Sequence, residues 1–119
     1  MKNQFGDCYS FILNLAKELS LPYDTQYQNM VDFARWNLPE EIALEWIDAE
    51  GMIKILEASG YLSDDALGIL QTILRNFALK FQLQDNSSWT HDAMRNDTFW
   101  NKQRSLALEA VNLMNNLNF

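Results

Sequence analysis

The chain has 119 residues, of which 48% are hydrophobic, and its formal net charge at pH 7 is −7. This length fits one domain, residues 1–119, whose core is large enough to need no disulfide or structural metal. The charge disfavours direct nucleic-acid binding, which needs clustered Lys and Arg, and no apolar run reaches the roughly 18–20 residues of a membrane span. One cysteine allows no intrachain disulfide, and no secretory leader is visible, so we expect a cytoplasmic protein that does not bind membranes.

The N-terminal third of the sequence predicts two helices. Apolar residues recur at helical rather than strand spacing throughout the chain. A first helix is expected over residues 7–20 and ends before Pro22, because proline disfavours helix in the residue that precedes it. Asp24 is the expected N-cap of a second helix that extends to Ala34.

The middle of the sequence predicts two short helices rather than one long one. Pro39 suits the first position of a helix, and the acids that follow it suit the positive end of the helix dipole. If residues 39–58 formed one straight helix at ~100° per residue, its polar side would jump by about half a turn near Gly51. We therefore predict a break within residues 48–51, with Asp48 as the cap of the second helix and Gly60 as its stop.

The C-terminal half predicts two long helices. Ser63 is the expected cap of a helix whose broad apolar stripe runs to Leu83, which favours it as the central, most buried helix. Residues 84–96 are expected to form a loop with one helical turn after Thr90, and the last helix is expected over residues 97–117. The sequence thus predicts an all-α fold, a compact irregular bundle of about six helices.

The sequence shows no catalytic or metal-binding motif. One His and one Cys cannot supply the three or four ligands of a zinc site, and neither a Gly-rich phosphate loop nor a nucleophile elbow is present. Cys8 is expected to be an unreactive thiol on a helix face, and His91 a solvated side chain in a polar loop. Glu41 and Glu45 have the spacing of a carboxylate pair, but acids are favoured at a helix start for structural reasons alone. We therefore expect no enzyme activity, no cofactor and no metal.

The net charge lies in one stretch of the chain. Residues 36–74 contain eight acids and a single base, Lys54, whereas acids and bases balance elsewhere. Three of the acids follow one helix face without a base to pair with them, and like charges at this spacing repel. The pattern fits either a solvated face or a docking surface for a basic partner, with a tryptophan as an interface contact. For the docking surface, the predicted contacts are Glu40, Glu41, Glu45, Trp46, Asp48, Glu50, Asp64 and Asp65.

In size, acidity and helical pattern, the chain resembles the small immunity proteins of bacterial toxin–immunity pairs, such as those that protect against colicins or contact-dependent inhibition toxins. The resemblance covers the whole chain in general character and involves no diagnostic motif, so it assigns no site residue. It implies an inhibitor that binds one cognate toxin, most often a nuclease, whose basic phosphate site an acidic face can occupy. The alternative is a helical adaptor or regulatory subunit that binds a partner helix or peptide in an apolar groove. A homodimer is compatible with either function.

Overall fold

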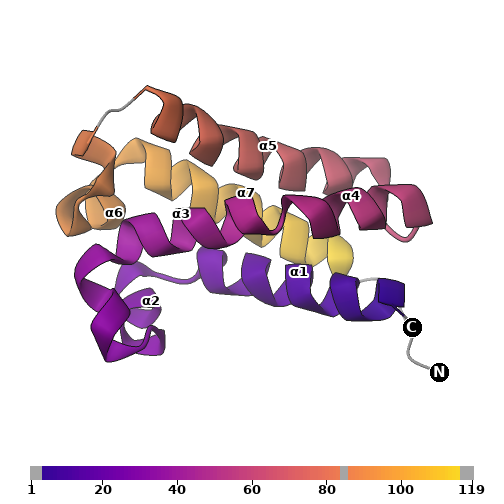
Figure 1. Ribbon diagram of the computed structural model, residues 1–119, viewed down its shortest axis with the longest axis horizontal. Helices are drawn as coiled ribbons and strands as arrows, with labels where there is room; N and C mark the ends of the chain where they lie inside the picture. Colours follow the sequence, from indigo (N-terminus) through magenta and orange to yellow (C-terminus); the bar gives the residue numbers. More distant parts are fainter. Residues whose placement is uncertain (1–3, 84–85, 116–119) are drawn as a thin grey trace.

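The computed structural model describes residues 4–83 and 86–115, and this part of the chain is helical and contains no strand (Figure 1). The all-α prediction is therefore confirmed. The elements in chain order are α1 (Gln4–Ser20), α2 (Tyr23–Asn29), η1 (Asp32–Asn37), α3 (Leu38–Asp48), α4 (Glu50–Ser59), α5 (Asp64–Gln82), η2 (Asn86–Trp89), α6 (His91–Asn96) and α7 (Thr98–Met114), where η denotes a 3-10 helix.

Four helical segments form the body of the bundle, with α3 and α4 together as one interrupted segment. α1 packs against α7 and α4, and α5 packs against α7, α3 and α4. Successive segments run in opposite directions (Figure 1), as expected where neighbours in sequence are also neighbours in space. The shorter helices α2 and α6 lie together at one end of the bundle, opposite the end where α1 begins.

The core lies between these four segments. Each contributes one apolar face, as the helical periodicity predicted. Six residues of α7 are buried and only four of α5, so α7 rather than α5 is the more buried helix. The prediction for α5 is wrong because two residues that widen its stripe, Leu79 and Leu83, are 48% and 70% exposed. The largest fully buried side chains are Trp46, Trp100, Phe77, Ile12, Leu19, Leu38, Ile53, Leu56, Leu70, Ile73, Met94 and Met114.

Several local signals act as predicted. The hydroxyl of Ser63 accepts a hydrogen bond from the backbone N–H of Ala66 at 3.1 Å, which caps α5. A helix, α6, follows Thr90 as predicted, and the hydroxyl of Thr90 caps it by accepting a hydrogen bond from the N–H of Ala93. The chain passes from α3 to α4 at Ala49, within the predicted break, and Gly60 ends α4 in the left-handed conformation at φ 76°. The predicted cap at Ser63, the break and the stop at Gly60 are confirmed.

Several predicted boundaries differ. α1 begins at Gln4, three residues before its predicted start. α2 ends at Asn29, because the two residues that follow are extended and lead into η1, so no helix continues to Ala34. The N-cap of α2 is Pro22 rather than Asp24. Asp48 does not cap α4, because the N–H of Ala49 still bonds to the carbonyl oxygens of α3 and no extended residue separates the two helices. Of the predicted last helix, Leu117 lies outside the described residues.

Two glycine substitutions should change stability in opposite directions. A Cβ at Gly60 or at Gly68 meets no heavy atom within 4 Å, so backbone conformation alone decides the outcome. Gly60→Ala should lower the free energy of unfolding by about 1 kcal/mol, because its φ is positive. Gly68→Ala, inside α5, should raise it by about 0.5–1 kcal/mol. Urea denaturation followed by circular dichroism measures both, and a loss of stability in Gly68→Ala would contradict this account.

Candidate docking groove

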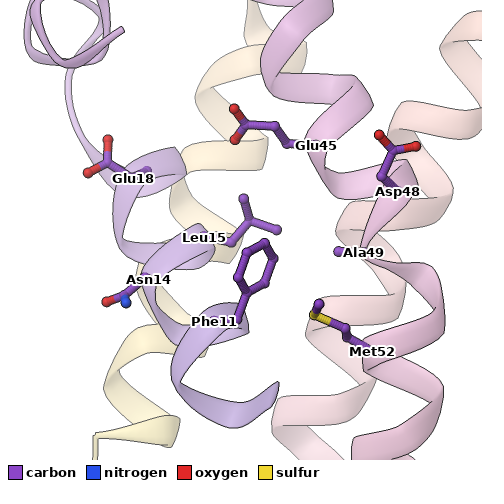
Figure 2. Close-up of a pocket in the computed structure, with 8 residues that line it drawn as sticks. All are labelled: Phe11, Asn14, Leu15, Glu18, Glu45, Asp48, Ala49 and Met52. Atoms are coloured by element: carbon purple, nitrogen blue, oxygen red, sulfur yellow. The ribbon is translucent and has the colours of Figure 1, made fainter. Parts of the chain in front are cut away.

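A groove with a volume of ≈ 680 Å³ lies on the bundle surface between α1 and the junction of α3 and α4 (Figure 2). Its floor is apolar. Leu15 and Ala49 are buried, Met52 is half-buried, and Phe11 is 47% exposed. The side chains of Phe11, Leu15 and Met52 lie between the two helical segments in Figure 2. Ala49, whose side chain ends at Cβ, stands at the helix junction and so leaves depth in the groove.

The rim of the groove is acidic. Glu18 of α1 and Glu45 of α3 lie on opposite sides of the groove, and Asp48 follows Glu45 by one turn (Figure 2). Asn14 completes the lining, which therefore includes three carboxylates and no Lys or Arg. Such a rim creates a negative potential over an apolar surface, which attracts a cationic group that can also bury aliphatic or aromatic carbon.

A smaller hollow of ≈ 200 Å³ continues the groove toward α2. It is lined by Gln26, Asn29, Met30 and Ile42 together with Glu18 and Glu45, the same two carboxylates that border the main groove. No Lys or Arg lines this hollow either. The two hollows adjoin at Glu18 and Glu45, and together we call them the furrow. Apolar side chains lie at both of its ends, and these two carboxylates lie between the hollows.

Glu45 is an acid of the furrow whose pKa is raised. Burial of its carboxyl group raises its pKa, and the negative charges of Glu41 and then Glu18 raise it further. The residue as a whole keeps solvent-exposed surface, so screening reduces these effects. No base in the furrow offsets them. The folded protein thus holds a carboxylate that ionises less readily than in the unfolded chain, and a bound cation would favour its ionised form.

The raised pKa predicts how Glu45→Gln affects stability. An acid whose pKa is raised in the folded state destabilises the fold where it is ionised, and this cost vanishes below the pKa of the unfolded chain. Glu45→Gln should therefore be more stable than the wild type at pH 7, and the difference should fall toward zero as the pH drops below about 4.3, the reference pKa of Glu. Urea denaturation at several pH values measures this. A gain from Glu45→Gln that persists at acidic pH would contradict it.

The structure separates the predicted contact residues. Glu45 and Asp48 line the groove, and Glu41, one turn before Glu45, accepts a hydrogen bond from Asn37 at 3.1 Å. Glu40 lines a different hollow, formed with Phe81, Asn86 and Trp89.

The remaining predicted acids lie outside the furrow. Glu50 is paired with Lys54 at 3.4 Å. Asp64 and Asp65 are in the first turn of α5, at the opposite end of the bundle from the start of α3 (Figure 1). The acids of residues 40–65 therefore do not form one continuous surface.

The prediction that Trp46 contacts a partner is wrong. Its side chain is 0% exposed and lies in the core, so it offers no contact to a partner. It shares the buried face of α3 with Ile42 and Ala43, at the spacing of one helical turn. The prediction that His91 is a solvated side chain in a loop is also wrong. His91 is half-buried in α6 and lies within hydrogen-bond distance of the Tyr23 hydroxyl at 2.6 Å and the Trp36 carbonyl oxygen at 3.1 Å.

Two other residues pack with the interior. Cys8 is buried. Trp89 is half-buried and stacks on Phe81 with ring centroids 4.4 Å apart, so it covers the edge of the core.

Six residues of the groove were not predicted as contacts: Phe11, Asn14, Leu15, Glu18, Ala49 and Met52. They belong to α1, to α4 and to the junction before α4, whereas the predicted acids of the groove belong to α3. Only the packing of α1 against α4 brings them together with the acids of α3. The one available signal was that Phe11 stands at the edge of its apolar stripe, where exposure is common.

No group of three or more His, Cys, Asp and Glu among the described residues could hold a metal ion. No helix within the described ranges has the length and apolar character needed to cross a membrane.

Fold and groove together define an antiparallel helical bundle with an acidic, apolar-floored furrow on one side. Comparison of the chain with protein-family models, curated proteins and solved structures finds no match. Its function is therefore inferred from the residues of the furrow.

Proposed function

We propose that this protein binds and neutralises a basic protein partner, in the manner of an immunity protein that blocks a nuclease toxin. The observation that carries the proposal is the furrow between α1 and α3, where Glu18, Glu45 and Asp48 surround an apolar floor that no Lys or Arg lines. A basic surface would satisfy the three carboxylates, and apolar side chains on it would cover Phe11 and Met52. The protein would act by occupying the partner's site.

The charge distribution supports rapid capture of such a partner. A net charge of −7 attracts a cationic protein over a distance set by the ionic strength. Complementary potentials raise association rates by orders of magnitude at low salt. A nuclease is basic where it holds phosphate, so the furrow and the substrate would compete for the same surface.

The experiment is capture of partners from the native lysate at low and high salt, followed by an assay of the captured protein's activity with and without this chain. The test variant combines Glu18→Gln, Glu45→Gln and Asp48→Asn. The matched control combines Asp64→Asn, Asp65→Asn and Glu109→Gln, which removes the same charge from exposed positions outside the furrow. We expect one basic partner that is inhibited by the wild type and the control but released by the test variant and by salt.

Other results would overturn the proposal. An acidic or neutral partner, no partner, or a basic partner whose activity is unaffected by binding would each contradict neutralisation. If the control variant lost the partner as completely as the test variant, net charge rather than the furrow would explain binding.

The second candidate function is a helical adaptor that binds a partner helix through apolar contacts. The exposed ring of Phe11 over the floor of the groove favours it. Salt separates the two functions, because a partner held by apolar contacts would survive high salt and the loss of the three carboxylates.

A further inference from the structure

The furrow constrains the conformation of its occupant. Its walls are helices, whose backbone N–H and C=O groups are bonded within each helix. The described residues contain no strand, so no sheet edge is present there to pair with an extended peptide. An occupant must therefore satisfy its own backbone, and an α-helix laid into the furrow does so.

The length of the furrow sets the number of contacts. Ile42 lines one end and Met52 the other, ten residues apart on the wall formed by α3 and α4. At a rise of 1.5 Å per residue this is about 15 Å, or nearly three helical turns. The apolar ends are Met30 with Ile42 and Phe11 with Met52, and Glu18 with Glu45 stand between them.

From this order of side chains, we infer that the furrow binds a basic amphipathic helix of the partner, which places apolar side chains at the two ends and one Arg or Lys between Glu18 and Glu45. This inference rests on the proposed function and names the element that the furrow recognises. The guanidinium group of Arg presents donors on more than one edge, so it can bond to carboxylates on both walls.

Charge selects this occupant over an uncharged helix. Glu45 already experiences the negative charges of Glu41 and Glu18. An apolar or acidic helix would bury these carboxylates further without a counter-charge, which is unfavourable. A cation at the centre of the furrow offsets the repulsion between the carboxylates and donates hydrogen bonds to them. Apolar side chains of the helix on either side of the cation pack against the apolar ends of the furrow.

The test is a titration of the isotope-labelled full chain with a designed helical peptide that carries leucines one turn apart and arginines between them. A peptide with glutamates in place of the arginines is the charge control. We expect the arginine peptide to shift the backbone amide signals of α1, α3 and α4 along the furrow, and the glutamate peptide to leave them unchanged.

Variants locate the site. Phe11→Ala should weaken binding of the arginine peptide about tenfold, and Glu18→Gln with Glu45→Gln should weaken it about fivefold or more. The matched control is Leu108→Ala, which removes an equally exposed apolar side chain from α7 and should change nothing. Circular dichroism confirms that each variant is folded.

Three outcomes would overturn the inference. The peptide could shift signals elsewhere, for example around the exposed Phe33 and Trp36 of η1. Leu108→Ala could weaken binding as much as Phe11→Ala. The furrow signals could instead move on dilution of the chain alone, which would make a second copy the occupant. The proposed function is decided separately, by whether a basic partner is captured and inhibited in the lysate experiment.

Discussion

Replacement of Trp100 by alanine should lower the free energy of unfolding by about 3–5 kcal/mol, enough to remove much of the stability of a domain this size. The side chain is 0% exposed. Its ring lies 5.4 Å from that of Phe77 and 5.8 Å from that of Phe99, centroid to centroid, and its indole N–H donates to the carbonyl oxygen of Ser88 at 2.9 Å. Alanine would leave a cavity where α7 meets α5 and would leave Ser88 without this donor. Urea denaturation followed by far-ultraviolet circular dichroism measures the loss.

A matched tryptophan separates the hydrogen bond from the packing. Trp46 is equally buried, but its indole N–H has no hydrogen-bond partner among the described residues. Trp100→Phe should therefore cost about 1 kcal/mol more than Trp46→Phe, because only the first substitution removes a buried hydrogen bond. Equal losses in the two variants would show that the bond to Ser88 adds nothing to stability.

The fold could be predicted from the sequence because its signals are local. The cap at Ser63 and the stop at Gly60 depend on a few neighbouring residues. The break at Ala49 was visible because the charges on its two sides fall on opposite faces of a continuous helix. Where a boundary was wrong, as after Asn29, the apolar pattern continued while the backbone became extended.

Only part of the candidate site could be predicted from the sequence, because tertiary packing assembles it from separate helices. Glu45 and Asp48 share a helix face, which spacing reveals, but Glu18 belongs to another helix and joins them only across the seam. Trp46 was wrongly predicted as a partner contact because that prediction followed the acidic residues around it. The four-residue spacing of Ile42 and Trp46 instead places the tryptophan on the buried face of α3. The two residues that His91 contacts lie 68 and 55 positions away in the sequence, so no local sequence pattern predicts these contacts.

A buried polar network holds the end of α1 that carries Glu18. The side-chain amide of Gln26, 2% exposed, donates to the carbonyl oxygens of Leu19 at 3.0 Å and Glu18 at 3.2 Å. The amide oxygen of Gln26 accepts a hydrogen bond from Arg104 of α7 at 3.1 Å. Arg104 also donates to the carbonyl oxygen of Met94 in α6. The network thus ties α1, α2, α6 and α7 together at the end of the bundle where the furrow begins.

Gln26→Leu should lower the free energy of unfolding by about 2–3 kcal/mol. Leucine fills a similar volume, but it removes the Gln26 donor from the carbonyl oxygen of Leu19 and leaves that of Glu18 with only the N–H of Leu21. It also leaves the half-buried guanidinium of Arg104 with one acceptor fewer. Burial already lowers the pKa of Arg104, so this charge is in a poorly solvated position. Urea denaturation of the variant at neutral pH provides the measurement.

A double-mutant cycle with Arg104→Met tests whether the two residues act as one unit. Because Met carries no charge, Gln26→Leu in this background no longer strands a cation, so the double variant should lose about 1 kcal/mol less than the two single losses combined. Additive losses would mean that Gln26 acts only on α1.

The network also predicts a functional effect, because the carbonyl oxygen of Glu18 is one of its acceptors. Gln26→Leu should therefore weaken partner binding even in the folded protein, although its side chain is almost fully buried. If binding persisted unchanged, the position of Glu18 would not depend on this network.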